Sequence, residues 1–371
     1  MKNLLYGKPI FIFLLFLLYI IPIFAQNDSL NNPQTELFPI INYDSDAGFG
    51  YGGKAFLYNQ LNQKESFDIT LYNSTKGERW YRFAFSIMDM QRRQGKEFPL
   101  AFDLIIDYDK WISYRYYGVE YFSQRDSLYE YETYTREPFE ISGLLSRGFT
   151  ENLVGSIGLK YKTISSYNFN INGELKKFNG LFNKTYIKTL SLIATLKWDS
   201  RNSFINPNKG IITQVDFEYA PNFSFTNEDY LKLSFTFQNY VTVIIPKIIL
   251  ASRIIGQMIS PKNVPIQLQL PIGGNNTLRG LPQDRYLSAS TIIINNEIRF
   301  PIWKRLGGIS GLDVGSTGAT TEYEFWSQKL SGWIINPVLG LRYYMDNFIV
   351  RFDVGFGNEA TGIYFNFGHI F

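Results

Sequence analysis

The 371-residue sequence contains no cysteine and a single histidine, His369. Disulfide bonds are therefore excluded, and so are metal sites built on cysteine or on several histidines. The sequence also lacks a glycine-rich phosphate-binding loop, a His-Glu-x-x-His zinc motif and a Gly-x-Ser-x-Gly nucleophile turn. We therefore expect no enzymatic activity, no cofactor and no metal, and we interpret His369 as a terminal-strand or rim residue rather than a catalytic base.

The sequence also has no large excess of positive or negative charge. The 36 Lys and Arg residues nearly balance the 33 Asp and Glu residues, so the formal net charge is only +3. A nucleic-acid-binding protein normally carries a concentrated basic face. The composition therefore argues against a nucleic-acid partner.

Long apolar runs are confined to the first residues. Lys2 and Lys8 precede an apolar stretch over 10–24, which Pro22 interrupts and a small residue, Ala25, follows. The stretch is short of the roughly 20 residues that span a bilayer as a helix. This pattern predicts a signal peptide over 1–25. Export without disulfides suits a fold that closes its own hydrogen bonds.

Period-two alternation recurs along the rest of the chain. In the run 348–356, Phe and Val occupy one face, while Ile349, Arg351, Asp353 and Gly355 occupy the other. The run 231–245 and the run 288–302, which carries Glu297, alternate in the same way. Many of these runs reach ten residues, whereas strands of soluble proteins average about five or six. Strands of about 9–11 residues with one apolar and one polar face are typical of outer-membrane barrels.

A coarse count finds sixteen such runs from 46–58 to 361–371, with 98–109 and 112–123 taken as separate strands. We therefore predict an all-β fold, a transmembrane antiparallel β-barrel of about 16 strands over 46–371. Residues 26–45 show no strong periodicity and are predicted to form a short periplasmic tether. Short turns, among them 76–77 and 110–111, are assigned to the periplasmic side, and longer loops to the outside.

The loop over 259–287 follows the eleventh run, so it is the sixth outside loop. Its tip, Gly273-Gly274-Asn275-Asn276-Thr277-Leu278-Arg279-Gly280-Leu281, places one arginine between glycines. Glycine tolerates backbone angles that other residues avoid, so this tip suits a loop folded into a confined space. The loop tip by itself favours an ordinary solvated loop arginine at Arg279.

Four segments together resemble the BamA/TamA superfamily, the bacterial surface antigen barrels. The loop tip is similar to the Arg-Gly tip of that family's sixth loop. Asp199 and Arg201, followed by Pro207 and Gly210, resemble its Asp-x-Arg-Asp…Pro-x-x-Gly turn. The third similar segment is Glu297-Ile298-Arg299-Phe300-Pro301. The fourth is Gly340-Leu341-Arg342-Tyr343 followed by Arg351-Phe352-Asp353-Val354-Gly355, and the chain ends on Phe371. The likeness is good over 186–371 and rests on pattern alone before that.

The resemblance implies that the sixth loop folds into the lumen and that Arg279, next to Gly280, contacts an acid on the inner wall. Alternation supplies the candidates, because Asp313, Asp353 and Glu297 all face inward. An arginine and a carboxylate can pair through two hydrogen bonds. We expect a lumenal lock in which Arg279 pairs with one of these acids, with Asp313 as the first choice and Asp353 as the second.

The resemblance also implies a seam between the first and last strands, at which such barrels open laterally. The predicted first strand carries inward-facing Gly48, Gly50 and Gly52, and the last carries Gly368 and ends at Phe371. Glycine weakens strand pairing. The glycines either loosen the seam or make space for the folded loop, and the sequence favours neither.

The expected function is that of an integral outer-membrane barrel in a Gram-negative bacterium, one that assists protein or lipid insertion or transport. Residues 26–45 leave no room for the periplasmic POTRA domains of assembly and secretion members, so the resemblance is to a barrel-only member. Outer-membrane lipids are expected partners, and a separate protein would have to supply the periplasmic module. The alternative is a passive porin. The sequence does not reveal the oligomeric state.

Overall fold

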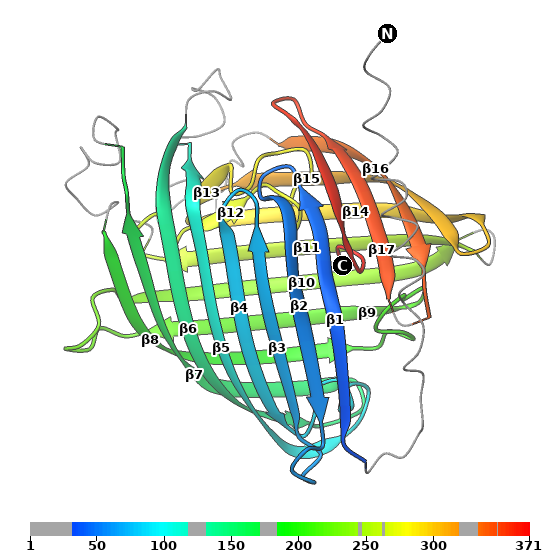
Figure 1. Ribbon diagram of the computed structural model, residues 1–371, viewed down its shortest axis with the longest axis horizontal. Coiled ribbons are helices and arrows are strands. Elements are labelled where there is room, and N and C mark those ends of the chain that lie inside the picture. The colour runs from blue at the N-terminus through cyan, green and yellow to red at the C-terminus, as the bar shows by residue number, and fades with distance from the viewer. Residues whose placement is uncertain are drawn as a thin grey trace.

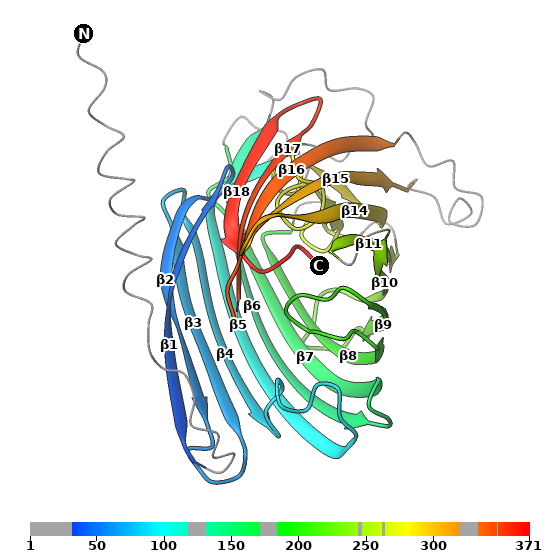
Figure 2. The same ribbon diagram turned by 90° about the vertical axis from the view of Figure 1, so that its right-hand side faces the viewer.

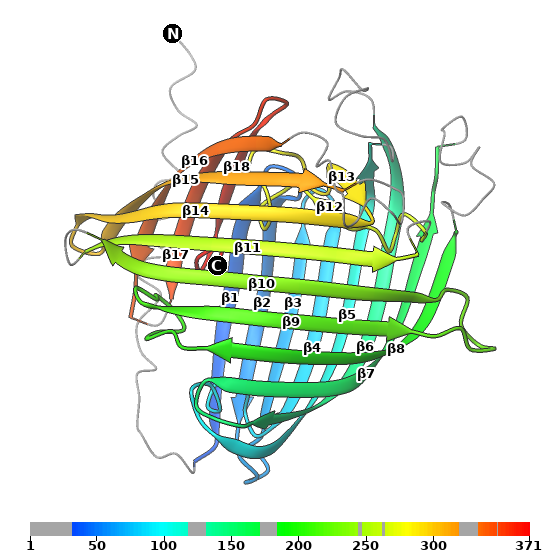
Figure 3. The ribbon, with the colours of Figure 1, turned by 180° about the vertical axis from the view of Figure 1, so that it is seen from behind.

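The structure is a computed structural model that describes residues 32–117, 131–170, 184–243, 247–261, 264–318, 333–346 and 348–371. These residues form a closed antiparallel barrel of sixteen strands and a separate two-stranded hairpin. Figures 1 and 3 show the barrel from opposite sides, with β1 to β6 on one side and β7 to β11 on the other. Within the described residues, no helix is long and apolar enough to cross a membrane.

In chain order the strands are β1 Gln34–Asp44, β2 Gly48–Tyr58, β3 Ser66–Ser74, β4 Glu78–Ile87, β5 Phe98–Tyr116, β6 Glu132–Gly148, β7 Leu153–Tyr167, β8 Tyr186–Asp199, β9 Gly210–Ala220, β10 Tyr230–Val243, β11 Ile248–Ser260, β12 Leu270–Ile272, β13 Tyr286–Ser288, β14 Ser290–Trp303, β15 Leu306–Thr317, β16 Ile334–Tyr344, β17 Ile349–Phe356 and β18 Thr361–Phe367. Strands β12 and β13 form the hairpin, and the others form the barrel.

Side chains alternate between the two faces of the wall, as the sequence predicts. On β14, Asn295, Glu297 and Arg299 are buried, whereas Ile298 between them is 48% exposed. The apolar face therefore points outward and the polar face points inward. The predicted all-β antiparallel barrel of about 16 strands is confirmed.

The predicted tether over 26–45 is wrong, because Gln34–Asp44 form β1, the first strand of the barrel. This strand pairs along its whole length with β2, from Gln34 opposite Tyr58 to Asp44 opposite Gly48. Apolar residues occupy both faces of β1 around Pro39, so the period-two pattern is hidden in the sequence. Proline is tolerated at this position because one edge of β1 is largely open. The predicted signal peptide, 1–25, lies outside the described residues.

A second error compensates for the first. The runs 98–109 and 112–123 are not two strands, because 98–116 form the single strand β5 with a register shift between Trp111 and Tyr114. Residues 110–111 are therefore inside a strand rather than in a turn. The extra first strand also moves the turn at 76–77 to the end of the barrel that carries the long loops. Loop six, residues 261–289, still follows the eleventh strand.

Apolar contacts fix the base of loop six. Ile266 packs with Tyr114, Tyr116 and Tyr134 from β5 and β6. Leu270, at the start of the hairpin, is fully buried in a second cluster that includes residues of β7 to β11. Burial of such side chains contributes about 1.5–3 kcal/mol each. Loop six is thus attached to the wall by packing before any of its charged groups are considered.

Candidate functional site

The tip of loop six follows directly from the β12–β13 hairpin. Gly273, Gly274 and Gly280 have φ angles of +130°, +87° and +96°, in the region that favours glycine. A Cβ atom on Gly280 would lie 2.7 Å from the backbone nitrogen of Gly357 and 2.8 Å from the carbonyl carbon of Gly355. Glycine at 280 therefore allows the loop backbone to lie directly against the backbone at the end of β17.

Arg279 is fully buried and contacts three carboxylates from three strands. Its Nε donates to Asp313 Oδ2 at 2.8 Å and its Nη2 donates to Asp313 Oδ1 at 2.9 Å. Its Nη1 donates to both Glu297 Oε1 and Asp353 Oδ2 at 2.8 Å. The backbone N–H of Arg279 also donates to Asp313, at 3.0 Å, and Asn336 Nδ2 donates to the Arg279 carbonyl at 2.9 Å. The three acids predicted from the alternation thus all accept hydrogen bonds from Arg279.

Two of the acids also contact arginines of the wall, and the third, Asp313, accepts from Asn295 Nδ2 at 2.7 Å. Glu297 accepts from Arg299 Nε at 2.9 Å and from Arg342 Nη2 at 3.3 Å. Asp353 accepts from Arg342 Nη1 at 2.5 Å and from Arg351 Nη1 at 3.3 Å. The result is a buried network in which Arg279 is the member contributed by loop six. Each charged group in such a network depends on its partners, because an unpaired buried charge is costly.

The arginines of this network and its amides have no role predicted from the sequence. The additional members are Asn295, Arg299, Asn336, Arg342 and Arg351. Alternation places Arg299, Arg342 and Arg351 on the inward face, and all three lie in motifs that carry the family resemblance. The sequence signal for this network is therefore the presence of inward arginines next to inward acids on neighbouring strands.

The predicted turn motif forms a compact structure between β8 and β9. Arg201 donates from Nε to Asp199 Oδ1 at 3.0 Å and from Nη2 to Asp199 Oδ2 at 2.9 Å. Gly210 has φ +109°, and a Cβ there would lie 2.4 Å from the Ser200 carbonyl oxygen. Pro207 is buried within the turn. The four motif residues thus close the turn through one bidentate ion pair and one close backbone approach.

The assignment of Gly48, Gly50 and Gly52 to the seam is wrong, because they lie on β2, the second strand. A Cβ on Gly50 would meet Asn42 Oδ1 at 1.9 Å and the Tyr72 hydroxyl oxygen at 2.3 Å. Glycine at this position makes room for side chains of β1 and β3. The seam lies instead between β1 and β18.

The assignment of Gly368 and Phe371 to the seam is also wrong. Gly368 has φ +79° and comes directly after the last strand. Phe371 then lies on inward arginines, with its ring centroid 5.1 Å from Arg253 Cζ and 5.3 Å from Arg299 Cζ. Its carbonyl oxygen accepts from Arg299 Nη2 at 3.0 Å. We call residues 368–371 the terminal segment.

His369, predicted from the sequence to be a terminal-strand or rim residue, lies in the terminal segment. It contacts two other parts of the chain. Its Nδ1 accepts from Arg342 Nε at 3.3 Å, and its Nε2 lies 3.2 Å from Asn206 Oδ1 in the β8–β9 turn. Burial, together with the charge of Arg299, lowers the pKa of His369 well below its usual value. A neutral ring that accepts from an arginine holds the terminal segment in place.

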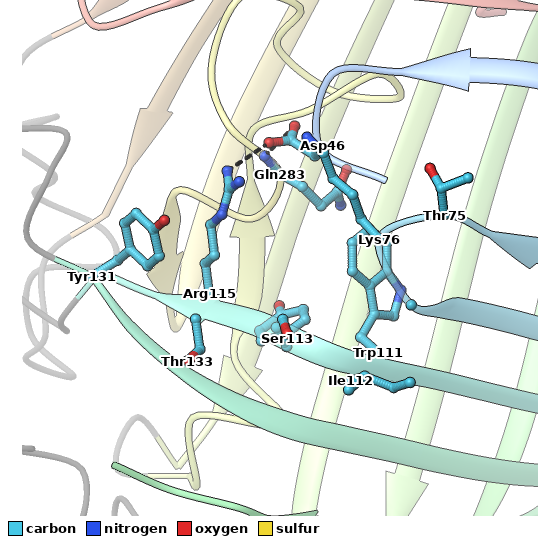
Figure 4. A pocket seen from close by; sticks show the side chains of 12 residues that line it. Asp46, Thr75, Lys76, Trp111, Ile112, Ser113, Arg115, Tyr131, Thr133 and Gln283 are labelled. Atoms are coloured by element: carbon cyan, nitrogen blue, oxygen red, sulfur yellow. Dashed lines mark hydrogen bonds and ion pairs between the residues drawn. The ribbon is translucent and has the colours of Figure 1, made fainter. Parts of the chain in front are cut away.

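A cavity of about 610 Å³ lies beside loop six at the end of the barrel that carries the long loops. Figure 4 shows Asp46 at its edge, facing Arg115 and Gln283. Asp46 accepts from Arg115 Nη1 at 3.1 Å and from the Gln283 backbone N–H at 2.8 Å. Burial raises the pKa of Asp46. Loop six is therefore tied to the β1–β2 turn as well as to the arginine network.

A second set of contacts ties loop six to the turn between β17 and β18. Arg285 Nε donates to Glu359 Oε2 at 2.5 Å, and the Tyr286 hydroxyl donates to Glu359 Oε1 at 2.6 Å. The Gly280 N–H donates to the Tyr364 hydroxyl of β18 at 3.2 Å. In the part of the chain that the structure describes, no group of three or more His, Asp or Glu side chains is arranged to hold a metal ion.

Comparison with known families agrees with this architecture. The Omp85 superfamily domain model matches residues 51–371, most of the chain. The chain belongs to the Omp85 superfamily. It is an integral barrel of the Gram-negative outer membrane, in agreement with the predicted family and location. The match begins within β2, so β1 lies just before it.

Solved structures support the fold at low sequence identity. BamA from Haemophilus ducreyi, in a crystal structure lacking POTRA domains 1-3, is 14% identical with a TM-score of 0.67, and the match covers 91% of this chain and 70% of that one. CdiB from Escherichia coli is 12% identical with a TM-score of 0.64, over 92% of this chain and 63% of that one. CdiB from Acinetobacter baumannii is 13% identical with a TM-score of 0.56, over 90% and 59%. The chain thus spans less than two thirds of both CdiB chains. No curated protein matched the sequence.

Proposed function

We propose that this Omp85 barrel acts without catalysis, as a member of the assembly and translocation class that assists the insertion or transport of protein or lipid at the outer membrane. In this proposal loop six occupies part of the lumen, and Arg279 with its three acids forms the lumenal lock. Strands β1 and β18 form a seam that separates to admit a substrate. A partner in the periplasm and the surrounding lipids complete the system.

The observation that carries this proposal is the short pairing at the seam. Strand β1 pairs with β18 only at Tyr43 opposite Phe365 and Asp44 opposite Tyr364. The same strand pairs with β2 over all of its 11 residues. Figure 2 shows β1 and β18 close together near one end and diverging toward the other. Separating β1 from β18 therefore breaks fewer backbone hydrogen bonds than separating any other two adjacent strands of the barrel.

Loop six supports a direction for this separation. On one side of the seam it contacts Asp46, in the turn after β1, and on the other side it contacts Glu359, in the turn before β18. Ser45 adds hydrogen bonds to Ile363 at the same end. The outer end of the seam is therefore bridged, while the described residues provide no such bridge at the inner end, toward Gln34. We propose that opening starts at the inner end.

Reversible crosslinking tests the seam. The chain has no native cysteine, so Tyr43→Cys with Phe365→Cys introduces a single disulfide between paired positions of β1 and β18. Phe235→Cys with Gly256→Cys introduces a matched disulfide between β10 and β11. The readout is the rate at which liposomes containing the barrel accelerate the insertion of an unfolded outer-membrane protein. We expect the seam disulfide to abolish acceleration, reduction to restore it, and the β10–β11 disulfide to have no effect.

Acceleration that persists across the oxidised seam would eliminate lateral opening. If even the unmodified barrel does not accelerate insertion, the substrate is not an unfolded protein of this kind. Lipid transfer between vesicles is then measured with the same disulfide variants. Gentle extraction followed by co-purification identifies the periplasmic partner. The assembly role fails if the barrel supports neither transfer.

A passive porin is the second candidate, and ion pairs on the inward face of β6, β7 and β9 favour it. Inward Lys160 contacts Glu218 at 2.6 Å, and inward Lys162 contacts Glu140 at 2.6 Å. Paired charges of this kind line a polar interior. Planar-bilayer recordings discriminate between the candidates, because steady large openings indicate a porin and small or flickering openings indicate a plugged barrel.

A further inference from the structure

The outward face of β8 changes from apolar to charged at Lys188. Ile187 and Thr189 on either side of it are fully buried and face inward, so Lys188 faces outward. The residues that follow it on the same face form an apolar stripe: Leu190, Leu192, Ala194, Leu196 and Trp198. Figure 3 shows β8 within the continuous wall made by β7, β8 and β9.

The length of the stripe gives the depth of Lys188. Trp198 lies ten residues after Lys188 on β8, which at about 3.3 Å per residue is about 33 Å along the strand. A strand tilt of about 40° reduces this to about 25 Å along the barrel axis, the height of the apolar band of an outer-membrane barrel. If Trp198 marks one boundary of the band, Lys188 lies at the other, in the outer leaflet.

Two aromatic rings flank the ammonium group. Lys188 Nζ lies 5.9 Å from the centroid of the Tyr161 ring on β7 and 5.8 Å from that of the Phe225 ring in the β9–β10 loop. Phe225 is itself stacked on Phe223 at 5.5 Å with an interplanar angle of 4°. The rings of Phe223 and Phe225 remain 41% and 49% exposed. Exposed aromatics at this depth are suited to the membrane interface.

The loop that supplies these rings is fixed to β8 at Lys188 and at Tyr186. The Lys188 N–H donates to Asn227 Oδ1 at 2.7 Å, and the Asn227 N–H donates to the Lys188 carbonyl at 3.0 Å. Asn227 Nδ2 donates to the Tyr186 carbonyl at 2.8 Å. Asn227 therefore holds the aromatic pair and the lysine in one arrangement.

Lys188 differs from its neighbours in its charge partners. Lys110, which also faces outward, contacts Glu137 at 3.2 Å, and Lys184 pairs with Glu228. Across the described residues, no carboxylate forms an ion pair with Lys188, and its contacts are the two rings. A positive charge at the lipid boundary, with aromatic walls and no acid of its own, matches an anionic headgroup with attached acyl chains.

We propose that Lys188, Tyr161 and Phe225 form a binding site for the phosphorylated headgroup of an outer-leaflet lipid. The ammonium contacts the phosphate, while Phe223 and Phe225 lie against the upper part of the acyl chains, and the stripe from Leu190 to Trp198 contacts the remainder. The site depends on the outer-membrane location and is independent of seam opening.

Native mass spectrometry of the detergent-solubilised full chain, titrated with diphosphoryl lipid A, tests the site. We expect a retained lipid whose apparent affinity falls about fivefold in Lys188→Gln, since a lysine close to an anionic surface contributes about 1 kcal/mol. Lys188→Arg should retain the lipid, and Phe225→Ala should weaken it. Lys110→Gln is the matched control, because it removes an outward lysine that already has an acid partner.

Folding of every variant is verified by its heat-dependent gel mobility. Equal lipid retention by Lys188→Gln and Lys110→Gln would overturn the proposal. Inorganic phosphate is added as a competitor, and displacement of lipid A by phosphate alone would show a site for a free anion rather than for a lipid. Retention of phosphatidylcholine as strong as that of lipid A would show that the charge has no role.

Discussion

Replacement of Arg279 by alanine tests the lumenal lock most directly. The variant removes the guanidinium that contacts Asp313, Glu297 and Asp353. All three carboxylates are fully buried, and they retain only the wall arginines and amides as partners. The variant therefore leaves either unpaired buried charge or a displaced loop.

The structure sets the size of the effect. Removing one partner of a buried ion pair costs about 3–5 kcal/mol, because the remaining charge is left without compensation. Arg299, Arg342 and Arg351 still neutralise part of the acid charge, which favours the lower end of that range. The matched control is Arg305→Ala, which breaks an ion pair to Asp346 with side chains 54% and 85% exposed. Exposed pairs contribute about 0–1 kcal/mol.

The assay is the temperature at which the folded barrel loses its heat-dependent gel mobility, together with conductance in planar bilayers. Arg279→Ala should unfold at a clearly lower temperature than the parent and should conduct more, whereas Arg305→Ala should match the parent in both. The exchange Arg279→Asp with Asp313→Arg should recover part of each property. Identical behaviour of Arg279→Ala and Arg305→Ala would refute the lock.

Three further predictions follow from the same contacts. Gly280→Ala should displace the tip of loop six and raise conductance, because the φ of +96° at Gly280 and the 2.7 Å approach of its Cβ position to the Gly357 nitrogen leave no room for a side chain. Gly256→Ala is the control and should have no effect, because no atom lies within 4 Å of the Cβ position at Gly256. Equal conductance in the two variants would contradict this prediction. Arg201→Ala should destabilise the β8–β9 turn by about 1–3 kcal/mol, because the half-buried Asp199 loses its bidentate partner, and protease cleavage in this turn should become faster than in an Arg305→Ala control. The pKa of His369 is lowered in the folded state, so the unfolded state binds the proton more readily, and stability should fall as the pH drops below about 6.5. In His369→Gln the unfolding temperature should decline less between about pH 7.5 and pH 5, and an unchanged decline would exclude the histidine as its cause.

Alternation was sufficient to predict the barrel, but it failed where the wall departs from regular pairing. Strand β1 was missed because apolar residues on both sides of Pro39 remove the period of two. Strand β5 was divided because the bulge between Trp111 and Tyr114 reverses which residues face inward. Both failures have a local physical cause, and neither affects the strands from β6 onward.

The acids near Arg279 were named from the sequence because facing inward is a property of a single strand. The arginines that share those acids were not, because their contacts depend on the stagger between neighbouring strands. Arg342 on β16 meets both Glu297 on β14 and Asp353 on β17. Such contacts between elements are set by the closed barrel and by the docked loop, so the pattern within a single strand does not specify them.

The position of the terminal segment bears on why the seam is short. The pairing of Tyr43 with Phe365 fixes a register that, continued, would place Phe371 opposite Leu37. Instead, the chain turns at Gly368, and the Ile370 and Phe371 carbonyls accept from Arg253 and Arg299. The terminal segment therefore does not pair with β1 and instead forms hydrogen bonds with inward arginines. Arg253 also donates to the Asn276 carbonyl of loop six, so the same inward arginine contacts both loop six and the segment that turns away from β1.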